Sequence, residues 1–441
     1  MMGAEMPFLT TSADRGRSPR AWPLHQRLVA FSFVGCLIAF TDRVNISIAA
    51  VSMRAQFGWS ETQVGWVLSA FFVGYMPFLF VSGLLARRFG GRRVAGIALI
   101  VWSLFTLLTP LAATVSVPML IAIRIGMGMG EAGLFPAVYD LLGRLVPAHE
   151  RARATAQFVS GVPLGTIVGL SASGWLIARY SWSMPFYFFG VAGLVWALLW
   201  FRYLRHDGHP PSSAPEDSIE PLQLRSLLLR GAVWAIVAAQ FATNWTQHML
   251  LSWLPSYFRD VQGISTAKTG LLSAAPWLAM AVATILCGSL SDRMIRRGIG
   301  VSRVRKLMQG VGLLGSALLL SAAGGAHTPA AASLLVTGAT AAVGCAVCGF
   351  VPAILDIAPR HSGILVGFTN TLAQIPAFTG VLVTGWLVDS TGSYLAAFML
   401  AGAISVAGTF IFARFFDSSR ITGEGITPST IPPPENLGRR E

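Results

Sequence analysis

The sequence predicts an all-α membrane protein in which twelve transmembrane helices form two six-helix bundles. Of the 441 residues, 54% are hydrophobic and only 12% are charged, whereas soluble domains carry about 25% charged residues. The chain also contains twelve long apolar runs, and its longest polar interruption separates the first six from the last six. A chain this apolar cannot cover itself with a polar surface, so a soluble protein is excluded.

Each apolar run is long enough to cross a bilayer, since about 20 helical residues span a hydrocarbon core of about 30 Å. The runs lack the polar and apolar alternation of membrane β-strands, so helices are predicted. Four prolines within them, Pro136, Pro163, Pro255 and Pro376, are expected to interrupt their helices. The predicted spans are 27–51, 62–86, 94–114, 117–140, 154–177, 184–204, 231–255, 269–290, 307–324, 330–353, 362–388 and 394–416.

These spans divide the chain into five segments. They are an N-terminal tail (1–26), an N-terminal six-helix bundle (27–204), a central loop (205–229), a C-terminal six-helix bundle (230–416) and a C-terminal tail (417–441). Most of the 32 basic residues lie on the side of the two tails and the central loop, and the opposite side holds only Arg54, Arg179, Arg259 and Lys268. Because basic loops stay inside, both termini and the central loop are predicted to be cytoplasmic.

This distribution of charge also explains the net charge of +13 without a nucleic-acid partner. The basic residues are nearly all arginine, which suggests a bacterial chain, so we expect a multi-pass protein of a bacterial cytoplasmic (inner) membrane. We expect it to be a monomer. The four cysteines lie inside apolar runs, and Cys345 and Cys348 stand among small residues that favour helix packing. No disulfide scaffold, metal or cofactor is therefore expected.

Four charged residues lie inside predicted spans, namely Asp42, Arg43, Arg124 and Glu131. A charge at the bilayer centre costs about 2.5–3.5 kcal/mol on insertion scales and usually marks a transport path or a proton relay. One interpretation is purely structural, with Asp42 neutralising Arg43 or Glu131 pairing with Arg124. The concentration of all four in the first half favours a functional site.

Charge balance suggests how such a site would work. The four ionised groups sum to zero, so an entering anion would leave a net negative charge in a medium of low dielectric constant. If the anion takes Arg43 as its partner, Asp42 loses a stabilising cation and proton uptake becomes favourable. Glu131 is the second candidate proton carrier. We therefore expect Asp42 and Arg43 to face a shared aqueous cavity.

Sequence motifs in both halves resemble one family. Residues 83–93 (GLLARRFGGRR) and 288–297 (GSLSDRMIRR) repeat a Gly-x-x-x-x-Arg pattern that resembles the loop signature of the major facilitator superfamily. Residues 42–49 (DRVNISIA) resemble the first-helix signature of its anion:cation symporters, which include bacterial sugar-acid and organic-acid proton symporters, sialin and vesicular glutamate transporters. Further similar segments are 128–137 (GMGEAGLFPA), 253–257 (WLPSY), 356–363 (DIAPRHSG) and 367–371 (GFTNT).

The resemblance implies the major facilitator fold and proton-coupled symport of an organic anion, a sugar acid or another carboxylate, by alternating access. It implies substrate binding by Arg43, Tyr75, Arg124, Asn244 and Asn370, and proton coupling by Asp42 and Glu131. It implies gating by Gly83, Arg88, Gly90, Asp292 and Arg293. Arg87 departs from the family, since the first loop usually carries aspartate there.

Other functions fit the sequence less well, including a non-transporting receptor, which would not require a buried titratable cluster. A proton-coupled drug or organic-cation antiporter would use Asp42 or Glu131 for a cationic substrate, but Arg43 beside Asp42 disfavours it. A membrane enzyme would need a nucleophile–base pair or a metal cluster, and the spans show no such motif. Enzymatic activity is therefore not expected.

Overall fold

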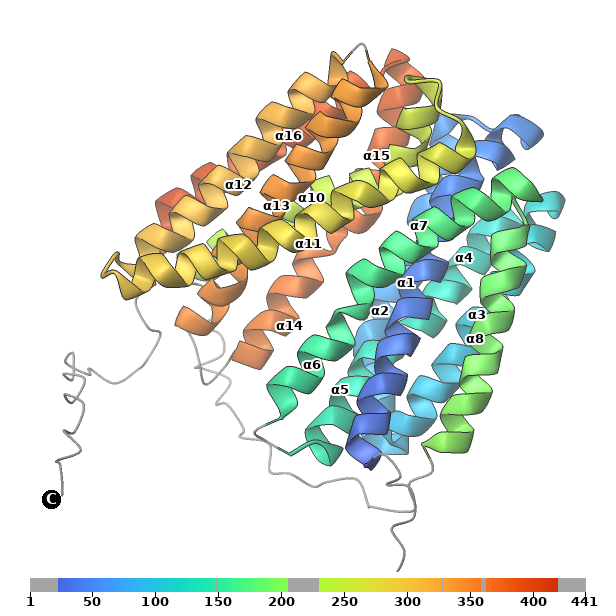
Figure 1. Cartoon of the computed structure of the whole chain (residues 1–441), viewed down its shortest axis with the longest axis horizontal. Helices are drawn as coiled ribbons and strands as arrows, with labels where there is room; N and C mark the ends of the chain where they lie inside the picture. Colours follow the sequence, from blue (N-terminus) through green and yellow to red (C-terminus); the bar gives the residue numbers. More distant parts are fainter. Residues whose placement is uncertain (1–22, 148–149, 205–229, 327, 358–361, 419–441) are drawn as a thin grey trace, which may run out of the picture.

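The computed structural model describes residues 23–147, 150–204, 230–326, 328–357 and 362–418. The predicted central loop 205–229, nearly all of both tails, and Arg360 and His361 of the motif at 356–363 lie outside the described residues. The described part is built from α-helices (Figure 1). This confirms the predicted all-α class.

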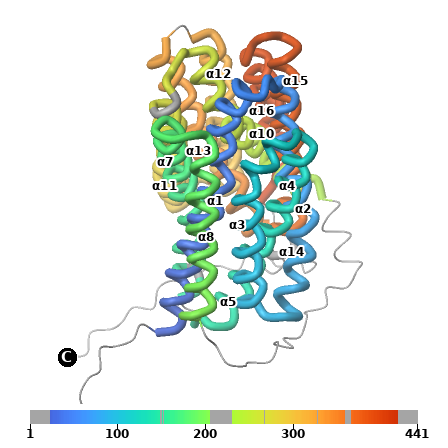
Figure 2. The backbone as a smooth tube through the Cα atoms, turned by 90° about the vertical axis from the view of Figure 1, so that its right-hand side faces the viewer, coloured from blue at the N-terminus to red at the C-terminus, as the bar shows by residue number. Residues whose placement is uncertain are grey.

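The first half contains α1 (Leu24–Phe57), α2 (Glu61–Phe89), α3 (Gly91–Val115), α4 (Val117–Glu131), α5 (Leu134–Leu145), α6 (Arg151–Val159), α7 (Gly161–Arg179) and α8 (Met184–Tyr203). The second half contains α10 (Gly231–Asp260), α11 (Thr266–Arg296), α12 (Val301–Gly324), α13 (Pro329–Ile357), α14 (Ser362–Ala373), α15 (Ile375–Thr391) and α16 (Tyr394–Phe415). Figure 2 shows that the axes of these helices are roughly aligned, as in a bundle of membrane-spanning helices.

Eleven spans of the described chain are long and apolar enough to cross a membrane, and each matches a predicted span. The twelfth predicted span is α10, whose 30 residues extend about 45 Å. Its hydropathy is lower because Gln240, Asn244, Gln247 and His248 lie along it. Polar residues inside a spanning helix normally face the protein interior or a water-filled cavity.

Three predicted spans are broken into two helices. The breaks lie at Ala132–Gly133, Ser160 and Gln374, and a proline follows each break within a few residues, as predicted for Pro136, Pro163 and Pro376. The prediction for Pro255 was wrong, because α10 continues through it as one helix. Proline lacks an N–H and therefore leaves a carbonyl of the preceding turn without its helical partner.

Side chains from neighbouring helices pair with carbonyls at two of these breaks. Ser82 Oγ of α2 donates to the Ala132 carbonyl at 2.9 Å, and Asn244 Nδ2 of α10 donates to the Ala373 carbonyl at 2.6 Å. A broken helix is tolerated in a membrane when its freed carbonyls are satisfied in this way. Each break is thereby held to a particular neighbouring helix.

The two halves meet mainly through the helix pairs α7 with α11 and α2 with α15. Small residues permit the close approach: a Cβ added to Gly65 of α2 would lie 3.6 Å from the Gly385 Cα of α15, and Gly270 of α11 packs against Gly174 of α7. These contacts lie toward the end where α1 and α10 terminate, which is the predicted outer side. Toward the other end the bundles diverge (Figure 1).

Candidate functional site

The centre of the candidate site is an ion pair between α1 and the end of α4. Arg43 Nε donates to Glu131 Oε1 at 3.0 Å, and Arg43 Nη2 contacts the same oxygen. The two side chains are 8% and 1% exposed. The second oxygen of Glu131, Oε2, is buried without a partner among the described residues.

Aromatic rings surround the guanidinium of Arg43. Its Cζ lies 4.4 Å from the ring centroid of Phe40, 4.9 Å from that of Phe71 and 4.7 Å from that of Tyr75. Such distances allow cation–π attraction. Tyr75, expected in the pocket from the resemblance, is thus brought directly against Arg43.

Close packing of α2 on α4 brings these residues together. A Cβ on Gly74 would collide with the Ile125 carbonyl, and a Cβ on Gly128 would collide with the Phe71 carbonyl. Only glycine fits at both positions, and the two backbones therefore touch. This contact sets Phe71 and Tyr75 of α2 beside the charged face of α4.

Arg124 lies on the same face of α4 as Glu131 and is 1% exposed. Its Cζ stands 5.3 Å from the Phe71 ring, so Arg43 and Arg124 share that ring. Its Nη1 lies 3.1 Å from the sulfur of Met127. The structural alternative in which Glu131 pairs with Arg124 is not what the described residues show, because the partner of Glu131 is Arg43.

Asp42 lies apart from Arg43. Its Oδ2 accepts a hydrogen bond from Trp102 Nε1 of α3 at 3.1 Å, its side chain is fully buried, and its Oδ1 has no partner in the described part of the chain. The structural interpretation in which Asp42 neutralises Arg43 was therefore wrong for the described residues, and a shared aqueous cavity stays a prediction. Successive residues of a helix point about 100° apart, and here they face different neighbours.

The second half contributes amide groups and a histidine. Asn244, expected to bind substrate, already donates to the Ala373 carbonyl, while Asn370 is exposed and accepts a hydrogen bond from Gln240. His248 packs edge-on against Phe72 of α2, with ring centroids 4.9 Å apart, and its Nδ1 is buried without a described partner. Gln240 was not predicted, although the low hydropathy of its span was a signal.

The expected gating residues lie at the predicted cytoplasmic ends. Gly90 has φ +86°, a conformation that favours glycine, and it separates α2 from α3. Arg88, Asp292 and Arg293 are exposed, and a Cβ added to Gly83 would lie 4.0 Å from the Pro136 side chain. Among the described residues, no ion pair joins any of these five to the opposite half.

Two aspartates near these loops bind within their own halves. Asp140 accepts from the Gly91 N–H at 3.3 Å and from Arg144 Nε at 2.8 Å. Asp356 accepts from Arg305 Nε at 2.8 Å, and Arg305 Nη1 donates to Ser291 at 3.0 Å. Each aspartate therefore ties together helices of its own half.

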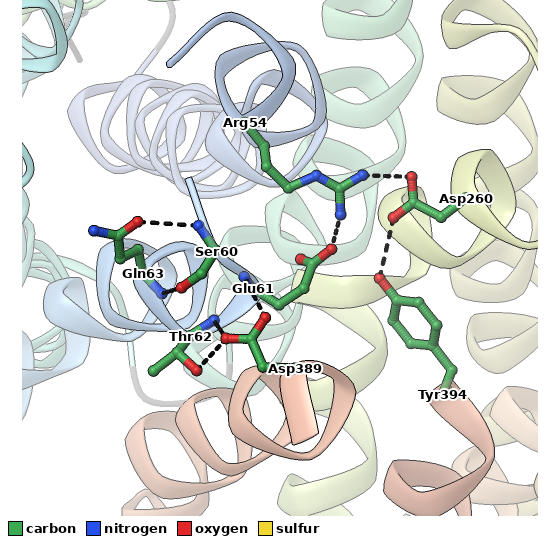
Figure 3. Close-up of polar contacts among 8 residues, drawn as sticks. All are labelled: Arg54, Ser60, Glu61, Thr62, Gln63, Asp260, Asp389 and Tyr394. Carbon is green, nitrogen blue, oxygen red and sulfur yellow. Dashed lines mark hydrogen bonds and ion pairs between the residues drawn. The ribbon is translucent and has the colours of Figure 1, made fainter. Parts of the chain in front are cut away.

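A polar network that the sequence analysis did not identify joins the halves at the predicted outer end (Figure 3). Arg54 of α1 pairs with Glu61 and donates to Asp260 Oδ1 of α10 at 2.7 Å. Asp389 of α15 accepts from the N–H groups of Glu61 and Thr62 at 2.8 and 2.6 Å, and so caps the N-terminus of α2. Tyr394 of α16 lies 3.5 Å from Asp260.

Comparison with known proteins identifies the family. A model of the Major Facilitator Superfamily matches residues 31–381. The ascorbate transporter of Arabidopsis thaliana chloroplasts is 34% identical over 416 residues, covering 91% of this chain and 76% of that protein. Sialin of Ovis aries is 32% identical, covering 90% of this chain and 92% of sialin.

Solved structures show the same fold. A bacterial homologue of the human lysosomal transporter Spinster, in an inward-facing and unoccupied conformation, superposes with a TM-score of 0.73 at 19% identity, covering 89% of this chain and 95% of that one. The D-xylose–proton symporter superposes with a TM-score of 0.69 at 18% identity, covering 88% and 97%. The chain therefore belongs to the major facilitator superfamily and, within it, to the anion:cation symporter family of membrane transporters, as its helix motifs predicted.

Proposed function

We propose that this protein carries an organic anion, a sugar acid or another carboxylate, across the membrane together with protons. The observation that supports this most directly is the Arg43–Glu131 pair, because a buried arginine is a natural ligand for a carboxylate. The curated relatives include proteins named as anion, ascorbate and phosphate transporters. A cationic substrate would be repelled by the two arginines that share Phe71.

The pair suggests how proton and anion are coupled. While Glu131 is ionised it occupies Arg43, and an entering carboxylate would have to displace it and leave it uncompensated in a buried place. Proton uptake by Glu131 removes that competition and frees Arg43 for the substrate. Proton and anion then bind together, and the net charge of the site is unchanged.

We extend the proposal to the other expected site residues, with roles suggested by their positions. Tyr75 and Arg124 flank Arg43 through its aromatic surroundings and would contact the anion from α2 and α4. Asn370, with its neighbour Gln240, would meet the substrate from the second half, whereas Asn244 holds the α14–α15 break beside it. Asp42, next to Arg43 on α1 but buried against Trp102 of α3, would be a second proton carrier.

Alternating access is proposed to proceed by rocking of the halves. The outer network of Arg54, Asp260 and Asp389 supports an inward-facing arrangement, since it joins the halves on the predicted outer side. In the opposite arrangement the loops with Gly83, Arg88 and Gly90 and with Asp292 and Arg293 would come together. We further propose a bacterial cytoplasmic membrane with both termini inside, on the basis of the arginine usage and distribution, and we propose that the protein is a monomer.

Transport in proteoliposomes tests the proposal. The full chain is reconstituted, and the external pH is recorded while sugar acids, dicarboxylates, aromatic acids or a cationic dye are added. Uptake of one anion with external alkalinisation is the expected result, and Arg43→Ala should abolish both. Anion uptake without proton movement would disprove the coupling, and proton-driven transport of the dye would favour the cation antiporter.

A further inference from the structure

A groove of about 540 Å³ lies between α2, α3 and α4 on the outside of the first bundle. Its walls are apolar side chains, among them Phe89, Ile97 and Phe105, and its floor is made of small residues. The main packing partners of α3 all belong to the first half, and α2, α3 and α4 run side by side (Figure 2). The groove therefore faces the bilayer and lies away from the second half.

Glycines let α3 pack closely on α4 along the floor of the groove. A Cβ on Gly126 would lie 2.5 Å from the Phe105 ring, and a Cβ on Gly133 would lie 2.9 Å from the Ala98 side chain. Gly126, Gly130 and Gly133, spaced four and three residues apart, all line the groove. Above this closely packed floor, the groove is lined by apolar side chains of α2 and α3 and is large enough for part of an acyl chain.

One cation stands in this groove. Arg93 is the only titratable residue of its lining, is exposed, and forms no hydrogen bond or ion pair through its side chain with the described residues. It lies in the first turn of α3, which contains no acidic residue. The positive end of the helix dipole adds to its charge, so an anion is favoured there.

We propose that this groove binds an anionic phospholipid, with the phosphate at Arg93 and an acyl chain along α3 and α4. The surroundings of an acyl chain are no more apolar in the groove than in the bilayer, so its burial does not select one lipid over another. The head group supplies it, because Arg93 lies at the predicted cytoplasmic end of α3, and the cytoplasmic leaflet is rich in anionic lipids that basic pockets between helices recognise.

The position of the groove would let a bound lipid influence the transport site. Its floor belongs to α4, whose other face carries Arg124 and Glu131, and it ends at the break that follows Glu131. A bound lipid would steady this break. The effect on activity rests on the proposed function, whereas lipid binding does not.

Native mass spectrometry of the purified full chain tests the binding. The protein in neutral detergent is titrated with phosphatidylglycerol or with phosphatidylcholine of the same acyl chains, and bound lipid is counted. We expect phosphatidylglycerol to be retained more strongly by wild type, and Arg93→Gln to reduce that preference about fivefold, ~1 kcal/mol by RT ln 5. Arg297→Gln, an exposed arginine of the second half, is the matched control.

Two further measurements separate the head group from the groove. Ile97→Trp fills the recess with an exposed apolar side chain and should reduce retention of both lipids while the protein stays folded. Inorganic phosphate should not displace the lipid. Equal retention of the two lipids by wild type, an unchanged preference in Arg93→Gln, or displacement by phosphate alone would overturn the proposal.

Discussion

Arg43 and Glu131 lie 88 residues apart in sequence, yet both donors of the arginine fork, Nε and Nη2, meet a single carboxylate oxygen, Oε1, while Oε2 of Glu131 remains buried and unpartnered. A bidentate pair would use both oxygens. The one-sided contact leaves Oε2 open to a proton without breaking the approach of Arg43. Under the proposed function, Glu131 would take its proton on this oxygen.

Glu131→Gln should uncouple transport from protons. Glutamine preserves the size of the side chain but cannot gain or lose a proton, and it leaves Arg43 free for the anion. We expect exchange of labelled for unlabelled substrate to continue, whereas accumulation driven by a pH gradient falls about tenfold or more, ~1.4 kcal/mol of lost driving force. Both are measured in proteoliposomes. Glu150→Gln, at a partly exposed carboxylate beside His25 and outside the site, is the control; equal loss of exchange and accumulation would refute the assignment.

Asp42→Asn should fold normally, because the amide oxygen can still accept from Trp102 Nε1. Exchange is expected to survive better than proton-driven accumulation if Asp42 carries a proton. Trp102→Phe is the structural counterpart, since it removes the donor and leaves a buried acceptor unsatisfied, at a cost of about 1–3 kcal/mol. Thermal unfolding of the two variants measures this difference. Loss of stability in Asp42→Asn equal to that in Trp102→Phe would assign Asp42 a structural role.

Opening of the outer end should depend more on Asp389 than on Arg54. The Arg54–Asp260 pair is partly exposed, with side chains 25% and 22% accessible, and such pairs contribute about 0.2–1 kcal/mol. Asp389 caps two N–H groups of α2 from the other half, and loss of a helix cap costs about 0.5–2 kcal/mol. Asp389→Ala should therefore raise the outward-open population more than Arg54→Gln.

Distances between spin labels at Ala55 and Val261, exposed residues at the outer ends of the two halves, measure this population. High salt should weaken the effect of Arg54→Gln, because charges in contact with solvent are screened. Arg179→Gln, an exposed outer arginine, should change nothing. A larger shift for Arg54→Gln than for Asp389→Ala would mean that the ion pair dominates this end.

The spans could be predicted because length and hydropathy suffice to identify a membrane helix. Even α10 was found, although its polar residues lower its hydropathy. Four charged residues of the site were also visible, since Asp42, Arg43, Arg124 and Glu131 stand out from apolar surroundings, whereas the buried Arg305 was not. The partners of these residues could not be predicted, because they depend on how each helix is rotated about its axis. The Gly74 and Gly128 contacts that set the approach of α2 to α4 act only in three dimensions.

The outer network shows the same limit more sharply. Asp389 caps a helix that begins 328 residues earlier in the chain, and no local pattern marks a carboxylate as a cap for a distant helix. Breaks before Pro136, Pro163 and Pro376 were predictable from proline chemistry. The continuity of α10 through Pro255 was not, since tertiary packing decides whether a proline ends a helix or only bends it.

Asn244 allows the binding and structural roles to be separated. Its Nδ2 donates to the Ala373 carbonyl at the α14–α15 break, so Asn244→Ala leaves a buried acceptor unpaired at a cost of about 1–3 kcal/mol. The melting temperature should fall, and substrate affinity, measured by thermal shift with the transported anion, should change less. Thr371→Ala, an exposed hydroxyl on the same segment, should leave both unchanged. If Asn244→Ala keeps its melting temperature and loses affinity, the amide contacts substrate directly and the carbonyl finds another donor.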